Sequence, residues 1–139
     1  MAIFFSDIEL KTNGEVEVRD ITKDVEKKIR ESKLSNGIVC IFVPGSTGAL
    51  TTIEYEPGLL KDLPEALERL FPKGKKYFHD NTWHDGNGHS HIRASFIGPS
   101  ITVPFRNSML TLGTWQQIVF IELDNRARNR KLIVEIIGE

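Results

Sequence analysis

The feature that most restricts the fold is a succession of short apolar segments, each of strand length and each bounded by turn-forming residues. In the second half of the chain we expect five such strands, at about 91–97, 100–105, 109–112, 116–124 and 130–137. The regular strand–helix–strand alternation that a parallel sheet requires is missing. The sequence therefore predicts an α+β domain built mainly from antiparallel, β-sandwich-like sheets with two to three helices.

Further strands are predicted in the first half of the chain. Val16 and Val18 alternate with charged residues, as in a strand with one buried face. The run from Ile38 to Val43 is apolar throughout and ends before Pro44, so we expect a strand that is covered on both faces. With these two, the predicted strands of this half are 2–10, 15–19, 38–43 and 51–55.

Two helices follow from apolar spacing and from start signals. Ile21, Val25 and Ile29 recur every four residues, which predicts an amphipathic helix capped by Asp20 or Thr22. A second helix is expected to begin at Asp62-Leu63-Pro64-Glu65, where a carboxylate, a proline and a glutamate stand in the order typical of a first turn. Its apolar face ends before a proline, which stops helices.

Size and composition exclude some classes of protein. A chain of 139 residues fits a single domain, 1–139. Lysine and arginine number 18 against 19 acidic residues, so bulk charge does not favour a nucleic-acid partner. The single cysteine, Cys40, excludes an internal disulfide and a multi-cysteine zinc site. No apolar run approaches the roughly 18 residues of a membrane span, and no signal segment is evident, so we expect a cytoplasmic protein without a membrane partner.

All four histidines lie in one short stretch between His79 and His91. His89 and His91 open the strand predicted at 91–97, where residues two apart share a face at a spacing of about 6.6–7 Å. With His79 folding back as a third ligand, these imidazoles would hold a divalent metal, zinc rather than magnesium, because magnesium prefers oxygen ligands. Two alternatives stay open: this face could simply be exposed to solvent, and His84 could be a ligand or an ordinary loop residue.

Other polar residues are candidates for substrate binding or proton transfer. The loop Gly45-Ser46-Thr47 offers consecutive backbone N–H groups to an anion, although an ordinary turn would look the same. Glu54 is either a general acid/base or a surface carboxylate. Arg126, Arg128 and Arg130 would share one face of an extended chain and could hold phosphate or carboxylates.

The chain resembles the YjbQ-type family, also described as secondary thiamine-phosphate synthases. The resemblance rests on Asn87–Ala94, Leu112–Ile118, Glu122 and Arg126–Arg130 and extends over nearly the whole chain. It implies a compact β-rich domain that forms a homotrimer around a metal or phosphate site. The family's polar positions fall on Glu54, His79, Asn87, His91 and Gln116, whereas Gly45 stands where many members carry a histidine, a loss that His89 would make good.

Residues and resemblance together favour a small metal-binding enzyme that acts on a phosphorylated small molecule. It would be a thiamine-phosphate synthase-like transferase or a metal-dependent hydrolase. Arg93 and the loop 45–47 would bind phosphate, Glu54 would move a proton, and Asn87 and Gln116 would complete the catalytic set. The alternative is a non-catalytic trimer that binds a metal or a phosphorylated metabolite without turning it over.

Overall fold

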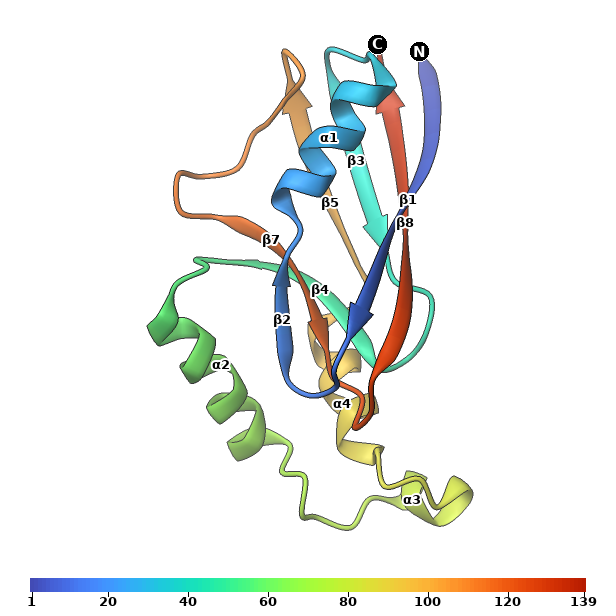
Figure 1. The fold of residues 1–139 in the computed structure, drawn as a ribbon, viewed down its shortest axis with the longest axis vertical. Helices are drawn as coiled ribbons and strands as arrows, with labels where there is room; N and C mark the ends of the chain where they lie inside the picture. Colours follow the sequence, from blue (N-terminus) through green and yellow to red (C-terminus); the bar gives the residue numbers. More distant parts are fainter.

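The computed structural model describes residues 1–139 as two antiparallel sheets with four helices (Figure 1). The larger sheet has the strand order β1-β8-β3-β5-β6 and the smaller one β2-β7-β4. The strands are β1 (Ala2–Thr12), β2 (Glu17–Asp20), β3 (Gly37–Phe42), β4 (Gly48–Ile53), β5 (Ser100–Arg106), β6 (Met109–Leu110), β7 (Gln117–Glu122) and β8 (Arg128–Gly138). The helices are α1 (Thr22–Ser32), α2 (Pro57–Leu70), α3 (Phe78–Trp83) and α4 (Gly88–Ile97). The predicted α+β class is confirmed, with four helices instead of two to three.

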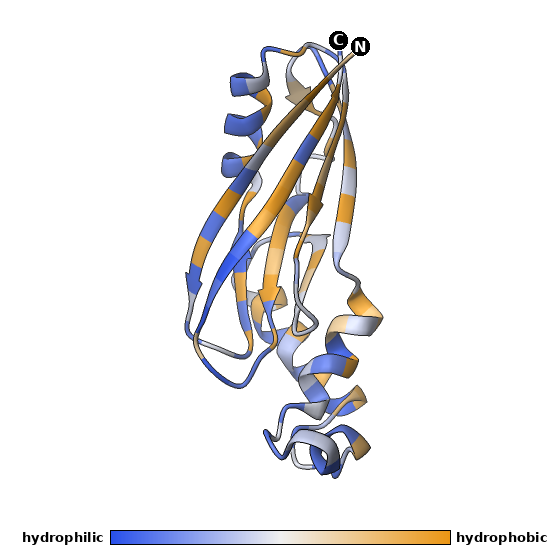
Figure 2. Ribbon diagram, turned by 90° about the vertical axis from the view of Figure 1, so that its right-hand side faces the viewer, coloured by the Kyte–Doolittle hydropathy of each residue, from blue (hydrophilic) through white to orange (hydrophobic).

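The main core lies between the sheets and under α1. Val25 and Ile29 of α1 pack in one cluster with Ile41 of β3, Phe120 of β7 and Val134 of β8, all of them buried. Along β8 buried and exposed residues alternate, because successive side chains point to opposite faces of a sheet, and both β1 and β8 contain apolar as well as hydrophilic residues (Figure 2). None of the helices has the length and apolar character needed to cross a membrane.

The apolar strand β3 is covered on one face only, contrary to expectation. Val39 and Ile41 are fully buried, but Ile38 is 42% exposed and Phe42 41% exposed. The exposed face is continued by neighbouring strands, since Ile38 stands opposite Ile137, and Ile137 opposite Ile3. The missing alternation therefore reflects an uncovered apolar outer face rather than a second covering layer.

Both predicted helix starts are displaced. The helix α2 begins at Pro57, where the Glu56 carboxylate accepts hydrogen bonds from the N–H groups of Gly58 and Leu59. Pro64 lies inside this helix instead of in its first turn. At α1 the residue before the helix is Ile21, and the Asp20 carboxylate accepts from the N–H and hydroxyl of Thr22. In each case a carboxylate just outside the helix binds its free N–H groups.

The predicted strand at 91–97 is wrong, because this segment is the helix α4. Its buried residues His89, Ser90, Arg93 and Ala94 have helical spacing, but three of them are polar and so suggest an exposed face. A strand would place Ile92, Ala94 and Phe96 together on its core face, but only Ala94 is buried, whereas Ile92 is 38% and Phe96 74% exposed. The helices α3 and α4 lie at the end of the molecule opposite the two termini, close to the turn between β7 and β8 (Figure 1).

Candidate functional site

The histidine-rich segment brings one imidazole and two carboxylates together. His79, Asp80 and Asp85 each offer a ligand atom, and these atoms lie within 4.8 Å of one another. His79 Nδ1 is 3.8 Å from Asp80 Oδ1 and 3.7 Å from Asp85 Oδ1, and it is buried without a hydrogen-bond partner. The ring of His91 packs on that of His79 with 4.1 Å between centroids. We call these four residues the histidine–aspartate group.

His91 is adapted to remain neutral. Burial lowers its pKa below the usual 6.5, and the neighbouring His79 lowers it further, while nearby carboxylates including Asp124 oppose the shift. Neutral imidazole is the form that binds a metal ion or accepts a proton. The group therefore combines an unprotonated ring nitrogen with carboxylate oxygens.

His89 points away from this group. On a helix, residues two apart differ by about 200° in direction, so His89 and His91 leave α4 on different sides. His89 is fully buried, and its Nε2 lies 2.5 Å from Glu15 Oε2. The other oxygen of that carboxylate is 2.6 Å from Lys73 Nζ. The three imidazoles predicted to share a metal are thus not brought together.

Asp124, just after β7, connects the histidine–aspartate group to the sheets. Its carboxylate accepts from the Asn87 amide (3.3 Å) and the Thr47 hydroxyl (3.1 Å), and it pairs with Arg128 at 2.7 Å. Burial by itself raises the pKa of Asp124, but these hydrogen bonds, that from the backbone of Asn125 and the charge of Arg128 together lower it. Asp124 is therefore held as a carboxylate.

Asn87 has a position between two carboxylates. In one orientation its amide nitrogen donates to Asp124, and in the reversed orientation it would donate to Asp85 at 2.9 Å. Asn87 is buried, and it directly precedes α4, which carries His91. The residue predicted to be catalytic thus lies beside the histidine–aspartate group, where its amide nitrogen donates to one of the two aspartates in each orientation.

A second buried ion pair stands next to Asp124. Arg130 donates through Nε and Nη2 to the Glu122 carboxylate, and through Nη2 to the Thr47 hydroxyl at 2.9 Å. Thr12 also donates to Glu122, at 2.7 Å. Arg130 and Arg128 do share a face of β8, as expected, but they bind carboxylates of their own chain.

The remaining predicted site residues lie elsewhere. Arg93 is buried and donates to the carbonyl of Phe71 and to Glu68, so it ties α4 to α2 instead of facing a ligand. Gln116 accepts from the N–H of Gly113 and donates to Thr52 in a turn before β7.

Glu54, predicted as the acid/base residue, is exposed just beyond the end of β4. Within the smaller sheet Ile53 stands opposite Gln117, whereas Gly48 stands opposite Glu122. Glu54 and Gln116 are therefore at the end of this sheet remote from Asp124. His84 ends α3 in a left-handed conformation and is exposed.

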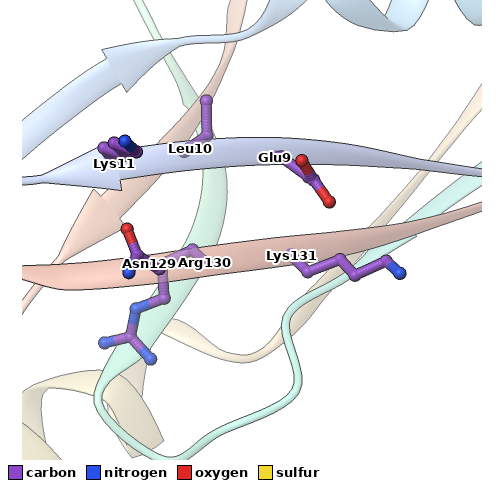
Figure 3. Close-up of a pocket in the computed structure, with 6 residues that line it drawn as sticks. All are labelled: Glu9, Leu10, Lys11, Asn129, Arg130 and Lys131. Carbon is purple, nitrogen blue, oxygen red and sulfur yellow. The ribbon is translucent and has the colours of Figure 1, made fainter.

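Two hollows of about 440 Å³ flank the β8 segment that carries the arginines, and a smaller one lies beside α4; one of the larger pair is lined by Pro44 and by Arg128, Arg130 and Ile133 of β8. The other lies between β1 and β8 and has a single apolar lining residue, Leu10 (Figure 3). Such a charged, open hollow differs from the mostly apolar pockets that hold small molecules. The same view shows the Arg130 guanidinium reaching away from Leu10, toward the loop that joins β3 to β4. The smaller hollow, of about 240 Å³, lies between that loop and α4, with the lining residues Gly45, Ser46, Gly48, Ala94, Ser95 and Pro99.

Comparison with known proteins settles the family. The family model described as "UPF0047 protein YjbQ-like" matches residues 6–139. The chain belongs to the YjbQ-like UPF0047 family. An Archaeoglobus fulgidus UPF0047 protein is 42% identical over 131 residues, which cover 94% of this chain and 99% of the relative. A Bacillus subtilis UPF0047 protein, YugU, is 32% identical over 133 residues, covering 94% of this chain and 97% of that protein.

Solved structures of the YjbQ-like family share the whole fold. A YjbQ-like protein of unknown function from Sulfolobus solfataricus superposes with a TM-score of 0.93 at 36% identity, over 99% of both chains. A family member from Clostridium acetobutylicum gives 0.87 at 38% identity, over 95% of this chain and 99% of that one. The resemblance to the YjbQ-type family is confirmed.

Sequence reasoning missed the aspartates that complete the site. Asp80 and Asp85 lie within the histidine-rich segment, so a search for mixed histidine and carboxylate ligands would have included them. Asp124 follows the apolar strand β7 and reads as part of an ordinary turn with Asn125. Only the packing of α4 against the smaller sheet brings it next to Asn87.

Proposed function

We propose that this YjbQ-like protein is a divalent-metal-dependent enzyme that transfers or hydrolyses the phosphorylated part of a small molecule. The observation that carries the proposal is the histidine–aspartate group, in which a buried His79 Nδ1 without a hydrogen-bond partner faces two carboxylates. A polar atom left unpaired in this way is costly, and a bound cation would satisfy it.

The donor set suits a divalent metal ion. His79, Asp80 and Asp85 would hold it, with the neutral His91 ring beside them. The ligand set contains two aspartates where we predicted His89. Zinc accepts both imidazole nitrogen and carboxylate oxygen, so this set still favours zinc. The additional oxygen ligands make magnesium or manganese better competitors than we expected. Such an ion would supply charge stabilisation for a leaving phosphate oxygen.

The protein's own residues would perform the remaining work. Asn87 would orient Asp85 through its amide nitrogen in one orientation, whereas in the other the same nitrogen donates to Asp124. His91, neutral at pH 7 and partly buried, is placed to accept a proton from an attacking group. Glu54 and Gln116 have no part in this arrangement within one chain, because they lie at the far end of the smaller sheet.

Turnover of defined substrates tests the proposal. We expect protein reloaded with zinc or manganese to release or transfer phosphate from some members of a panel of small phosphorylated metabolites, and EDTA to abolish this. The two precursors of thiamine phosphate are the transferase pair to try first, because of the family resemblance. The Asp85→Asn variant should lose activity, whereas Glu54→Gln should keep it.

If the metal binds but no member of the panel is turned over, the proposal fails. The non-catalytic alternative, a protein that only binds a metal or a phosphorylated metabolite, would then be favoured. Activity that is unchanged in EDTA and in Asp85→Asn would also contradict the proposal, since another site would have to be responsible.

The homotrimer implied by the resemblance belongs to the same proposal. The uncovered face of the larger sheet supports it: Ile3, Ile137 and Ile38 form an exposed apolar row across three strands, with Phe5 nearby at 67% exposure. Contiguous apolar surface of this kind is typical of subunit interfaces. Light scattering should give three times the chain mass, and Ile38→Glu with Ile137→Glu should give monomers.

A further inference from the structure

The guanidinium of Arg130 has one free nitrogen. Arg130 is only 3% exposed in its side chain, and its Nε and Nη2 are bound to Glu122 and Thr47. Its Nη1 makes no hydrogen bond within the chain and faces Gly45, where a Cβ atom would lie 3.1 Å from it. Because Gly45 has no side chain, this nitrogen is left uncovered.

The loop beside that nitrogen also has free donors. The backbone N–H groups of Gly45, Ser46 and Thr47 make no hydrogen bond to backbone or side chain. Consecutive N–H groups in a loop of this kind form a concavity that attracts anions. Gly45 and Ser46 also line the hollow of about 240 Å³ between the loop and α4, whereas Arg130 lines a separate hollow with Pro44 and reaches the loop at Gly45.

We propose that the hollow between the loop and α4 binds the phosphoryl group of a small phosphomonoester, through Arg130 Nη1 and the N–H groups of the loop 45–47. The inference deepens the proposed function, on which it rests for the reacting centre. Ser95, which lines the hollow, lies one helical turn after His91, and its hydroxyl donates to the His91 carbonyl at 2.8 Å. A turn advances about 5.4 Å, so the hollow begins about one helical turn along α4 from His91, a member of the histidine–aspartate group.

The carboxylates nearby do not cancel this attraction. Glu122 is balanced by Arg130, and Asp124 by Arg128, while Arg126 remains mostly exposed at 4.0 Å from Asp124. These five side chains therefore carry a net charge of +1. A volume of about 240 Å³ is below the roughly 300–1,000 Å³ of drug-sized pockets, which favours a phosphate on a small carbon skeleton.

Gly45 determines access to the anion site. Its φ of +117° is a conformation that side chains rarely adopt, and a Cβ at this position would crowd Arg130 Nη1. A residue with a side chain here would strain the loop and cover the free nitrogen. The glycine thus makes Arg130 available for recognition instead of confining it to its ion pair with Glu122.

Titration of metal-free protein with inorganic phosphate tests the inference separately from the metal. In EDTA and low salt we expect saturable binding by calorimetry. Ser95→Glu, at an exposed helix position, should weaken it about tenfold by charge repulsion. Ser95→Gln, of nearly equal size and without charge, should retain it, and Gly45→Ala should weaken binding without altering zinc affinity.

Two results would overturn the inference. One is the absence of phosphate binding by the unaltered metal-free protein, and the other is equal phosphate affinity in Ser95→Glu and Ser95→Gln. If zinc still binds in either case, the anion site alone fails and the proposed metal site stands. If phosphate binds as expected but zinc does not, the proposed function fails and the anion site stands.

Discussion

Polar side chains are exposed at one end of strand β7 and buried in ion pairs at the other. Where the strand begins, Gln116 lies exposed in a turn and bonds only to its neighbourhood. Where it ends, Glu122 is fully buried and Asp124 is 1% exposed. Each of these buried carboxylates is held by an arginine of β8, Arg130 or Arg128.

This difference shows that the Asp124 end of β7 contains buried charges, which destabilise the fold unless they are paired. A buried carboxylate costs several kcal/mol of desolvation unless it is paired and hydrogen-bonded. At the Asp124 end the network also positions Asn87 beside Asp85, so the histidine–aspartate group lies on a rigid support. At the Gln116 end the polar contacts close a turn and support no such group.

Breaking the buried ion pair should have the largest effect on stability. Arg130→Met leaves Glu122 buried without its partner, so we expect a loss of about 3–5 kcal/mol in the free energy of unfolding. Urea denaturation measures it. The matched control is Arg19→Met, which removes a partly exposed pair with Glu17 and should cost less than about 1 kcal/mol. Equal losses would mean that the buried ion pair at the Asp124 end contributes no more to stability than a partly exposed pair.

Substitution of His89 should destabilise the fold more than substitution of His91, which lies two residues away on the other side of α4. His89→Ala removes a fully buried ring and its contact with Glu15, so we expect a loss of about 2–3 kcal/mol. His91→Ala, on the other side of α4, should cost less than half as much. Thermal denaturation of the two variants compares them directly, and the reverse order would show that His91 carries the packing.

Acid should destabilise the Asp124 end in two steps. The lowered pKa of His91 means that the unfolded chain takes up its proton first, so stability falls as the pH drops below about 6.5. The lowered pKa of Asp124 adds stability that is present above about 3.8 and is lost as the pH falls further. Unfolding measured from pH 7 to pH 3 should show both losses.

Substitutions assign the two steps of acid destabilisation. His91→Gln should remove the loss that begins near pH 6.5, and Asp124→Asn should remove the one below about pH 3.8. Stability that rises on acidification through pH 6 would contradict the assignment of His91 as a neutral ring.

Substitutions at the Gln116 end should have the smallest effects. Gln116→Ala removes two side-chain hydrogen bonds of an exposed turn, and we expect a loss of about 1 kcal/mol or less. Glu54→Gln should change stability by no more than about 0.5 kcal/mol, as is usual for surface residues. A loss near that of Arg130→Met, measured by urea denaturation, would remove the contrast between the two ends.

The sheets were predictable because their strands obey simple rules. The apolar segment of β8 and the turn signal after Thr12 set strand limits that agree with the structure to within about two residues. The class of fold follows from these strands. The outer face of β3 was assigned wrongly, because an apolar run does not reveal whether its second face is covered or open.

The site was only partly predictable, because the helix α4 has the alternating polar and apolar pattern of a strand. His89, His91, Arg93 and Ser95 alternate with apolar residues and so resemble a strand. Two of these polar side chains are in fact buried, because Glu15 and the Phe71 carbonyl, both distant in sequence, bind them. His79 was nevertheless identified, since clustering of histidines does not depend on the secondary structure, and Asn87 was identified through the family resemblance.

The most direct test of the account is the zinc affinity of single variants, measured by calorimetry on metal-free protein. We expect one equivalent of zinc to bind per chain, and His79→Ala and Asp85→Asn each to weaken it at least about tenfold. Zinc affinity in His89→Gln should match that of the unaltered protein. If His89→Gln abolishes zinc binding while Asp85→Asn retains it, the metal is not held by the histidine–aspartate group and the central claim is wrong.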